Sequence, residues 1–548
     1  MIKDNSKIEK KDWIIILLLI LPITLLSFYK LGDNKVPKTY QFFPSSGYHA
    51  SVTLEKEEKV KKIRYYSGNK TGEFVLMSSI DGTNYEEVTT FESNSVFAWE
   101  DIELDIKTKN LQFISKTSSS TLGDIMLYGN NNEKIKIIKE KNNPIIDEQN
   151  LVPKEISYLN STYFDEIYYA RTAYEYAMGI DAFEWSHPPL GKLIMTIPVY
   201  LFGFSPFTYR LMSTLFGILL IPIMYIITKK IFKKRKWAIL GALLMIFDTF
   251  RFAHTRIALI DSFQLVFVLL SVLMLLIFIE NNPQKRKYRY LLLSGLFFGC
   301  SIATKWNAAY ISIALGIFLL KTMIEDYSKI NDKKKYYLKL ILLCILSFII
   351  IPLIIYILSY LLFPNLSFYD KTLTGINKLT KMMYNYHSSL TELHPFSSKW
   401  YEWPIMLRPL WLYTSDTING IRRTIVDIGN PAIWWFGIIS FIYVLISTFK
   451  KNKENTTITI LVLSTFIPYI LVNRPMFIYH YFITLPFIML GIVSFIKYLS
   501  EKLETNSLYY IYIIVISLFF FIFYPVVSGI PVSENYINTL RWFSSWIF

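Results

Sequence analysis

Long apolar runs are the feature that most limits what this chain can fold into. The stretches Ile14 to Phe28, Leu265 to Ile279, Leu338 to Leu362 and Tyr509 to Phe523 are predominantly apolar, and roughly 17 to 20 such residues cross the hydrocarbon core of a bilayer. Charged residues make up only 18% of the chain, against about 25% in a typical soluble domain. The sequence therefore predicts an integral membrane protein with several spans. The first run lacks a small-residue cleavage site, which favours a retained helix over a removed signal peptide.

The basic residues indicate which helix ends face the cytoplasm. The formal net charge is +15, which would suit a protein that binds nucleic acid or an anionic surface. The excess lies instead in short turns between apolar runs, which is typical of cytoplasmic turns, so we expect no nucleic-acid partner. These turns contain Lys229, Lys230, Lys233, Lys234, Arg235 and Lys236, then Lys285, Arg286, Lys287 and Arg289, then residues 333–335, then Lys450, Lys451 and Lys453.

This charge pattern predicts a mostly α, polytopic membrane protein with about 11 transmembrane helices. If the apolar segment 190–204 crossed the bilayer, the basic cluster at 229–236 would face outward, so we expect this segment to lie along the outer surface. The predicted spans are 13–30, 207–229, 236–249, 258–280, 288–304, 307–322, 337–363, 431–449, 456–472, 476–496 and 507–528.

Residues 31–155 interrupt the hydrophobic pattern and predict an inserted extracytoplasmic β-sandwich. Short alternating stretches such as Glu73 to Met77 and Trp99 to Ile106, bounded by turn residues such as Ser67-Gly68-Asn69, are typical of antiparallel strands. The run Glu73 to Val88 resembles the strand-turn-strand of discoidin or galactose-binding-like jelly rolls. Such a domain either binds sugar or wall polymer or serves as a spacer.

The chain is thus expected to divide at the ends of its apolar runs. The expected parts are a cytoplasmic start with the first helix (1–30), the β-sandwich (31–155), a catalytic outer loop (156–206), transmembrane helices (207–363), a second outer loop rich in Trp, Tyr and Pro (364–430), further transmembrane helices (431–528) and an outward tail (529–548).

Ionisable residues gather at the outer face of this predicted topology. All 6 histidines lie there, and ionisable groups at membrane depth are costly and suggest function. Asp165 and Glu166 form an acidic pair framed by aromatic residues. Partial desolvation beside apolar rings raises the basicity of a carboxylate, so this pair is a candidate general base. Two ordinary acids at the start of a surface helix would look the same.

A series of short fragments gives this acidic pair a context. In chain order they are Phe164-Asp165-Glu166, His187-Pro188-Pro189-Leu190-Gly191-Lys192, Tyr209-Arg210-Leu211, Thr255-Arg256-Ile257-Ala258-Leu259-Ile260-Asp261-Ser262, Lys305-Trp306-Asn307, Trp403-Pro404 with Arg408-Pro409, Gly429-Asn430-Pro431, and Tyr479-His480-Tyr481 followed by Leu485-Pro486. Each is unspecific alone. Their joint order and their predicted side of the membrane resemble the protein O-mannosyltransferases, polytopic enzymes of the GT-C fold that use a polyprenyl-phosphate sugar.

The resemblance implies a division of roles among these residues. Asp165 and Glu166 would be the catalytic acidic pair, with Asp165 the base toward the acceptor hydroxyl, whereas Arg210, Arg256 and Lys305 would hold the lipid-linked phosphate. Sugar transfer from a phosphate-linked donor needs one base, and it needs cations for the departing phosphate but no general acid. A guanidinium suits that task because it binds phosphate through paired hydrogen bonds.

For the remaining candidates, more than one role stays open. His187 and Lys192 either touch the donor or cap the surface helix, and His254, Asp261 and His480 either serve the site or act as buried partners that position Arg256. Asp261 fits the structural role better. The supporting residues are expected to be His254, Asp261, Arg408, Arg474 and His480.

Metal and disulfide chemistry are not expected. His387 and His394 are not accompanied by carboxylates at fixed spacing, so the sequence predicts no metal site. Cys300 and Cys344 both lie in apolar runs and predict no disulfide framework. No cofactor is expected beyond the polyprenyl-phosphate hexose, which is a substrate.

The leading prediction is an inverting glycosyltransferase that moves a hexose, mannose by the resemblance, to a Ser or Thr hydroxyl of an exported protein. The abundance of Lys, Ile and Asn favours a bacterial plasma membrane, with the catalytic face extracytoplasmic and an undecaprenyl-type carrier. The bilayer and the acceptor are the expected partners, and the family likeness adds a homo-oligomer.

Three alternatives remain open at this point. The same enzyme class acting on a wall polymer or glycolipid is one, because residues 364–430 are too few for the β-trefoil domain of eukaryotic relatives. A transporter would show internal repeats, and we find no convincing one. A glycan-binding membrane protein without catalysis would leave Asp165 dispensable.

Overall fold

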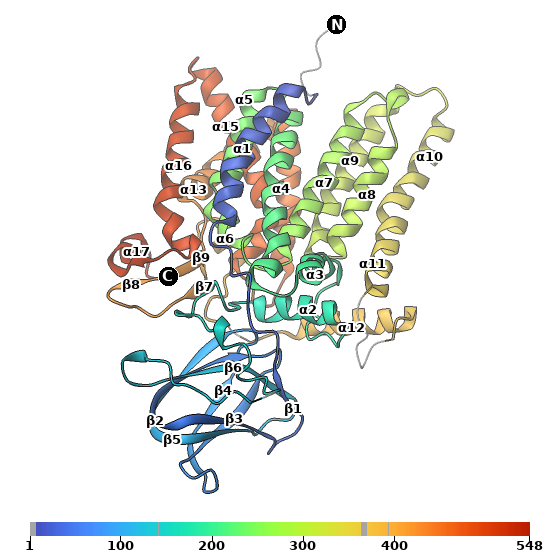
Figure 1. Ribbon diagram of the computed structural model, residues 1–548. Coiled ribbons are helices and arrows are strands. Elements are labelled where there is room, and N and C mark those ends of the chain that lie inside the picture. Colours follow the sequence, from blue (N-terminus) through green and yellow to red (C-terminus); the bar gives the residue numbers. More distant parts are fainter. Residues whose placement is uncertain (1–6, 141, 363–369, 393) are drawn as a thin grey trace. The chain divides into compact units, whose positions relative to one another are not determined.

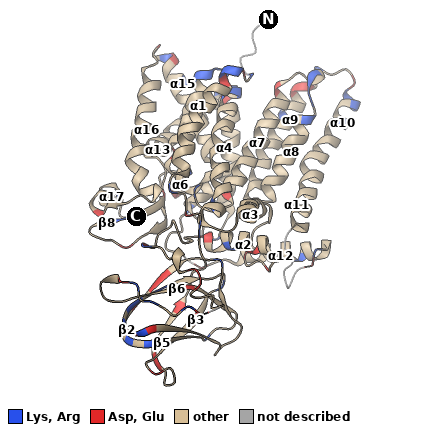
Figure 2. Ribbon diagram, viewed as in Figure 1, with Lys and Arg blue, Asp and Glu red and all other residues tan. Residues whose placement is uncertain are grey.

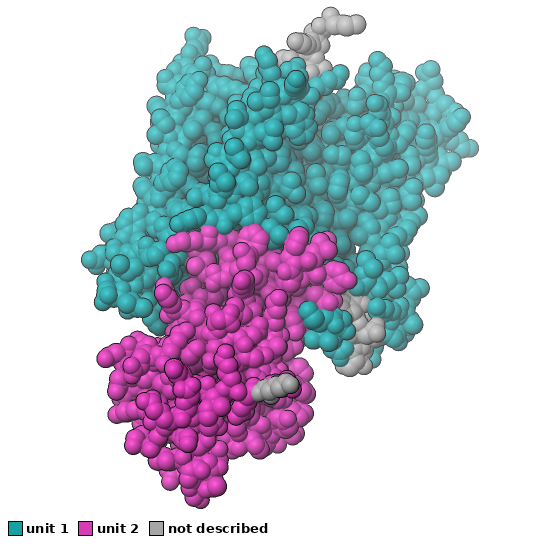
Figure 3. All heavy atoms as spheres, viewed as in Figure 1, with its two compact units in different colours: residues 1–29, 178–196, 211–548 teal, residues 30–177, 197–210 magenta. Residues whose placement is uncertain are grey.

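The computed structural model describes residues 7–140, 142–362, 370–392 and 394–548. The chain divides into two compact units, which are drawn in different colours in Figure 3. We call residues 30–177 with 197–210 the β unit, and residues 7–29, 178–196 and 211–548 the helical unit. Each unit is described by itself below, and Figure 1 labels their elements.

The β unit is built on six strands that form one antiparallel sheet. The strands follow one another in the sheet in the order β1-β6-β2-β5-β3-β4. The two longest strands, β2 and β5, pair along most of their length, with register shifts between Thr53/Glu58 and Val60/Lys62. Their bounds are β1 (Gln41–Phe43), β2 (His49–Ser67), β3 (Gly72–Ser79), β4 (Glu86–Ser93), β5 (Trp99–Ser115) and β6 (Ser120–Tyr128).

The core of the β unit explains why alternation in the sequence predicted these strands. Phe74 and Leu76 of β3 face inward with Leu111 and Phe113 of β5, and all four are fully buried. The antiparallel β domain is therefore present, although its strands are hydrogen-bonded into one sheet instead of the two sheets of a sandwich. Irregularities in the pairing of long strands increase twist and bend a sheet, which lets one sheet wrap a core.

Helices make up most of the helical unit, and some of them run across the boundary between the units. The α-helices of the described residues are α1 (Lys10–Phe28), α2 (Glu166–Met178), α3 (Leu190–Phe202), α4 (Pro206–Phe232), α5 (Arg235–Phe247), α6 (Thr249–His254), α7 (Asp261–Glu280), α8 (Arg289–Ile302), α9 (Ile311–Asp326), α10 (Lys333–Ile345), α11 (Ile351–Leu361), α12 (Leu373–Ser389), α13 (Pro431–Phe449), α14 (Lys453–Phe466), α15 (Leu485–Lys502), α16 (Ser507–Ser528) and α17 (Glu534–Leu540). Short strands also occur here, namely β7 (Leu410–Thr414), β8 (Ile421–Arg422), β9 (Thr424–Asp427) and β10 (Val532–Ser533).

Within the described residues, 8 helices are long and apolar enough to cross a membrane. The protein is therefore an integral, multi-pass membrane protein. These helices are Lys10–Phe28, Pro206–Phe232, Asp261–Glu280, Trp306–Asp326, Lys333–Leu361, Pro431–Phe449, Lys453–Leu471 and Ser507–Ser528.

The other three predicted spans coincide with helices that do not meet these criteria. They are α5, α8 and α15, of 13, 14 and 18 residues. Helix α5 ends early because Asp248 caps the next helix, α6, by accepting a hydrogen bond from the Arg251 amide. The predicted number of about 11 spans thus stays a prediction. The segment predicted to lie along the surface forms α3, whose 13 residues are too short to cross about 30 Å of hydrocarbon.

Close packing of α8 against the long helix Lys333–Leu361 depends on two glycines spaced four residues apart. A Cβ atom on Gly295 would lie 1.9 Å from the Ser347 carbonyl oxygen, and one on Gly299 would lie 2.7 Å from the Pro352 Cα. Small residues with this spacing let helix backbones approach in membranes. Ser347 lies in a π-helical turn, Leu346–Ile350, just before the proline.

Buried ion pairs join the ends of α1, α4 and α5. Asp12 of α1 is fully buried and accepts hydrogen bonds from Tyr225 and Lys229 of α4 and from Arg235 of α5. Figure 2 shows Lys and Arg at this end of the helices, near the start of α1 and at the turns around α8, α9 and α10. Part of the positive charge that marks these turns in the sequence is therefore used in holding helices together.

Candidate active site

The acidic pair lies at the start of α2, in the β unit. The Asp165 carbonyl oxygen accepts hydrogen bonds from the amides of Tyr168 and Tyr169, at 3.0 and 3.1 Å, and Glu166 is the first residue of the helix. Asp165 is half-buried. A carboxylate at the start of a helix is stabilised by the exposed amides and by the helix dipole. Phe164, directly before it, has a φ of +51°, a left-handed backbone conformation that is rare for a bulky residue.

Glu166 is bound by Arg210 in a fully buried ion pair. The guanidinium donates from Nε to Glu166 Oε1 at 2.7 Å and from a terminal nitrogen to Oε2 at 2.6 Å. Its other N–H groups donate to the carbonyl oxygens of Leu31, Tyr158 and Ser161, at 2.7 to 3.1 Å. All five N–H donors of Arg210 are therefore engaged within the protein.

Two predictions from the sequence concern this ion pair, and both stay predictions. Arg210 was expected to hold the donor phosphate, but its donors are satisfied by Glu166 and by backbone oxygens. Glu166 was expected to share the catalytic role, but both of its carboxylate oxygens accept from a guanidinium in the interior. A buried charge needs such pairing, so in this geometry the two groups stabilise each other.

His187 and Lys192 belong to the helical unit and hold one short loop. The Lys192 ammonium donates to Glu184 Oε2 at 2.5 Å, to the Glu184 carbonyl at 2.9 Å and to the His187 carbonyl at 2.8 Å. All three ammonium hydrogens are used in this way, and Lys192 is fully buried. Of the two roles considered for Lys192, the structural one fits the geometry.

Glu184 also orients the His187 ring, through a 3.1 Å contact between its Oε1 and Nδ1. Burial would raise the pKa of Glu184, but Lys192 and His187 hold this pKa below its ordinary value. Burial lowers the pKa of His187, against the opposing effect of Glu184. His187 therefore lies here as a neutral ring beside a charged carboxylate.

His387 of α12 lies between the loop that contains His187 and Arg474. Its Nε2 atom is 2.7 Å from the Ser186 carbonyl and its Nδ1 atom is 2.9 Å from an Arg474 nitrogen. A carbonyl only accepts and a guanidinium only donates, so the ring must be neutral with its proton on Nε2. Burial, His187 and Arg474 accordingly lower the pKa of His387 to about 4.

These residues form what we call the histidine–arginine cluster, which comprises His187, His387, Lys305, Arg474 and His480. The rings of His187 and His387 are 5.2 Å apart. Burial, Arg474 and Lys305 lower the pKa of His480, whose ring stacks on Trp403. Within the described part of the chain, Arg474 makes no ion pair with a carboxylate. Its charge is therefore not compensated by an acid of the described residues.

Lys305 is the first of four buried charged residues that contact one another in series. Its ammonium donates to Asp261 Oδ1 at 2.8 Å, Asp261 Oδ2 is 3.9 Å from His254 Nε2, and His254 Nδ1 is 2.6 Å from Asp427 Oδ2. Burial would lower the pKa of His254, but Asp427 and Asp261 raise it to about 9. Two cations and two carboxylates balance here, which fits the structural role expected for Asp261.

Arg256 caps the ends of two membrane helices. It donates to the carbonyl oxygens of Ser27 and Tyr29 at the end of α1 and of Ser528 at the end of α16, at 2.8 to 3.2 Å. The last carbonyls of a helix lack intrahelical partners and attract cations. The expected role of Arg256 in phosphate binding stays a prediction. Asp261 pairs with Lys305 and lies near His254.

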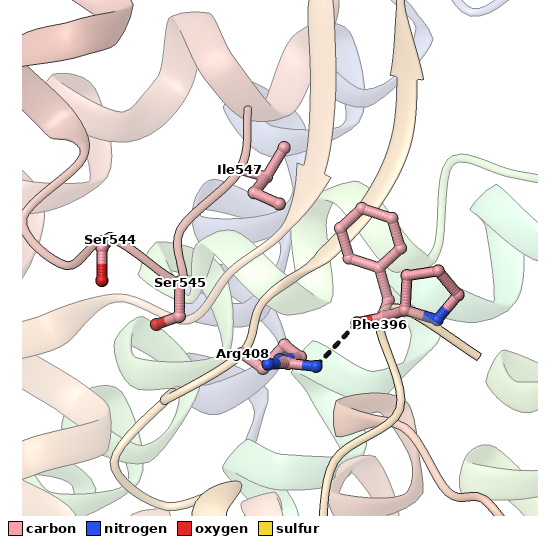
Figure 4. A pocket seen from close by; sticks show the side chains of 6 residues that line it. Phe396, Arg408, Ser544, Ser545 and Ile547 are labelled. Carbon is pink, nitrogen blue, oxygen red and sulfur yellow. Dashed lines mark hydrogen bonds between the residues drawn. The ribbon is translucent and has the colours of Figure 1, made fainter. Parts of the chain in front are cut away.

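Arg408 lines a separate small pocket of about 310 Å³, drawn in Figure 4. Its guanidinium donates to the Pro395 carbonyl at 2.7 Å. Phe396, Ser544, Ser545 and Ile547 complete the lining. Arg408 is exposed and makes no contact with the histidine–arginine cluster among the bonds found in the described residues.

Comparison with known families decides what kind of protein carries these residues. Residues 186–356 match the family model described as dolichyl-phosphate-mannose-protein mannosyltransferase, and residues 372–546 match the C-terminal four-transmembrane region of protein O-mannosyltransferase. The chain belongs to the protein O-mannosyltransferase family. Most of the β unit lies outside both matched ranges.

Relatives of this O-mannosyltransferase family member match most of its length. The polyprenol-phosphate-mannose–protein mannosyltransferase of Mycolicibacterium smegmatis is 22% identical over 459 residues, which are 70% of this chain and 87% of the relative. The proteins of the same name in Mycobacterium tuberculosis and Corynebacterium glutamicum are each 22% identical, over 66% of this chain and 80% and 81% of their own.

A solved protein O-mannosyltransferase structure shares the fold of most of the chain. The Saccharomyces cerevisiae protein O-mannosyltransferase Pmt1-Pmt2 complex bound to the sugar donor has a TM-score of 0.60, with 13% sequence identity, and the match covers 71% of this chain and 89% of that one. The GT-C fold expected from the sequence is therefore confirmed. The family match and the named relatives show that the protein is a glycosyltransferase.

Three residues of this O-mannosyltransferase were missed as site residues in the sequence. Glu184 and Asp427 were not singled out in the sequence, and His387 was considered only as a metal ligand and rejected. Asp427 contacts His254, which is 173 residues away in the sequence, and His387 contacts Ser186, which is 201 residues away. Only the spacing Glu184-x-x-His187, which suits a local contact, was a usable signal.

Proposed function

We propose that this protein transfers mannose from a polyprenyl-phosphate mannose to a Ser or Thr hydroxyl of an exported protein, with inversion at the anomeric carbon. The observation that carries the proposal is the division within the acidic pair of a protein O-mannosyltransferase family member. Glu166 is fully buried and forms an ion pair with Arg210. Asp165 is half-buried at a helix start. Asp165 is therefore the member of the pair that is suited to accept a proton.

The chemistry requires one base and a stabilised leaving group. As the bond from the anomeric carbon to the phosphate oxygen breaks, the sugar gains oxocarbenium character, and the acceptor oxygen attacks from the opposite face. Asp165 takes the hydroxyl proton during that attack. The phosphate leaves with its electron pair as an anion, so no general acid is needed, and cations lower the barrier to its departure.

Arg474 is the residue to which we assign the donor phosphate. Arg210 and Lys192 donate all their hydrogens to groups of the protein, and Arg256 donates to three backbone carbonyls. Lys305 is neutralised by Asp261. Arg474 instead donates to a neutral imidazole. The imidazole orients the guanidinium without cancelling its charge, which leaves that charge for an anion.

We place the reaction at the extracytoplasmic face of a bacterial plasma membrane. Two observations support this topology: the basic turns gather at one end of the membrane helices, which is typical of the cytoplasmic end, and the donors in the relatives' names are polyprenol-linked. A cysteine placed at Thr83, in the turn after β3, should react with an impermeant maleimide in whole cells, and one at Lys334 should react only after lysis. The opposite labelling would reverse the proposed face.

The function is tested by transfer in lipid nanodiscs. Purified protein receives polyprenyl-phosphate mannose with a radiolabelled sugar and a Ser/Thr-rich peptide, and the peptide is analysed by mass spectrometry and by an α-specific mannosidase. Asp165→Asn should lose transfer by about 10²–10⁴-fold, the range for a general base, while still binding the donor.

The matched control is Asp181→Asn, at an exposed acid in the loop after α2, which should transfer normally. Full activity of Asp165→Asn would exclude Asp165 as the base. Donor binding by the wild type without transfer to the peptide would redirect the proposal to another acceptor, and wall polymer and glycolipid acceptors are assayed in parallel for that reason.

A further inference from the structure

A second pocket, of about 400 Å³, lies where α4, α7 and α14 meet. It lies in the helical unit and contains none of the residues discussed above as site candidates. Its lining combines apolar and charged side chains from the three helices. The lining residues are Lys230, Ile231, Lys233, Leu276, Ile279, Glu280, Lys453, Glu454 and Thr457.

The charges around this pocket are unequal. Glu280 is paired with Lys230 at 2.7 Å, and Glu454 is paired with Lys497 at 2.7 Å. Lys233 and Lys453 are exposed and have no carboxylate partner among the described residues. Both carboxylates in the lining are thus neutralised, and two ammonium groups remain for an anion.

The location of the pocket suggests what that anion is. Helices α4, α7 and α14 all belong to membrane-crossing segments, and the pocket is at their ends. Lipid headgroups lie at the ends of membrane spans, and basic pockets between such helices bind anionic headgroups. The half-buried Ile231, Leu276 and Ile279 form the apolar part of the wall. A soluble anion would leave this wall unused, whereas a lipid covers it with its glycerol and upper acyl carbons.

We propose that this pocket binds an anionic glycerophospholipid, with the phosphate between Lys233 and Lys453 and the acyl chains along the apolar sides of the helices. The lipid would tie the end of α4 to the start of α14, two segments that are far apart in the sequence. The occupant is distinct from the polyprenyl donor, because the pocket lies among the basic turns that mark the predicted cytoplasmic ends.

The test measures lipid binding by the full-length protein in detergent. Native mass spectrometry and thermal unfolding are recorded with added phosphatidylglycerol, cardiolipin or phosphatidylcholine. We expect the anionic lipids, but not phosphatidylcholine, to bind and to raise the unfolding temperature. The double variant Lys233→Gln/Lys453→Gln should weaken binding of the anionic lipids about 10-fold or more, since each phosphate–lysine contact is charge-assisted.

The matched control is Lys334→Gln/Lys335→Gln, which removes the same charge from exposed residues at the start of α10 and should bind lipid as the wild type does. Equal binding of phosphatidylcholine, or unchanged binding by the Lys233/Lys453 variant, would overturn the proposal. Inorganic phosphate is added as a competitor. Displacement of the lipid by millimolar phosphate would show a site for free anions and would also overturn it.

Discussion

The carboxylate of Glu166 and the guanidinium of Arg210 are joined by two hydrogen bonds, of 2.7 and 2.6 Å, and neither side chain is exposed. Arg210 also donates to three backbone carbonyls, at Leu31 before the first strand in the sequence and at Tyr158 and Ser161 after the sixth. The pair therefore holds the start of α2 in place, and with it the adjacent Asp165. Glu166 thus contributes to the site by positioning Asp165, the proposed base.

Removing one partner of this pair should strongly destabilise the protein. Arg210→Met leaves the Glu166 carboxylate buried without a partner, which costs about 3–5 kcal/mol. The double variant Arg210→Met/Glu166→Gln should recover part of this loss, because it removes the uncompensated charge as well. Denaturant midpoints in detergent measure both. Lys116→Met, which breaks an exposed pair with Glu73 in the same unit, should cost no more than about 1 kcal/mol, and equal effects of the two single variants would contradict the role of burial.

The glycine contact between α8 and the π-helical turn predicts a steric effect. Gly295→Leu places a side chain where even a Cβ atom would be 1.9 Å from the Ser347 carbonyl, so we expect loss of folded protein after extraction. Gly316→Ala is the control, because a Cβ there meets nothing within 4 Å. That change should be neutral or stabilise α9 by up to about 1 kcal/mol. Size-exclusion profiles in detergent distinguish the two, and a normal profile for Gly295→Leu would refute the close packing.

The assignment of the donor phosphate to Arg474 predicts a change in affinity without a change in fold. Arg474→Gln removes a charge-assisted hydrogen bond, which is typically worth about 1.5–3 kcal/mol, or about 10- to 100-fold in donor affinity. Arg408→Gln makes the same substitution in the pocket of Figure 4 and should bind the donor normally. Affinities are measured by quenching of tryptophan fluorescence. If the Arg408 variant loses more affinity than the Arg474 variant, Arg408 and its pocket bind the donor phosphate instead.

Asp124 of β6 predicts a pH dependence in the β unit. Burial raises the pKa of this carboxyl to about 7, and the charges of Asp147 and Glu148 add to the effect. The folded β unit therefore binds a proton that the unfolded chain releases near pH 4, so stability falls as the pH rises from about 4 to 7, by up to about 4 kcal/mol.

Asp124→Asn should remove that dependence, because an amide cannot ionise. Hydrogen exchange of residues 120–128, corrected for the intrinsic pH effect, reports the local stability. Protection that rises with pH in the wild type, or the same pH profile in the variant, would show that Asp124 does not control it.

Much of the fold could be predicted because membrane helices and strands each produce a local pattern of apolar residues in the sequence. Eight of the predicted spans coincide with apolar helices of the structure, since each span satisfies its own backbone hydrogen bonds within a continuous apolar stretch. Strand β3 was predicted from alternation alone because its inward side chains, Phe74 and Leu76, lie two residues apart. The ends of α5, α8 and α15 differ from the predicted ends, because hydropathy does not show where a cap or a 3₁₀ segment such as Ile478–Ile483 adjoins a helix.

The sequence by itself determined the membrane class, the β domain, the family and the acidic pair. Only the tertiary structure decided which ionisable groups are paired with other groups of the protein. Arg210 and Glu166 are 44 residues apart, and His254 and Asp427 are 173 apart, so no local pattern reveals either pair. A buried charge is stabilised only by partners that folding brings to it. An arginine can therefore stabilise the fold, as Arg210 does, or remain available to bind an anion, as we propose for Arg474.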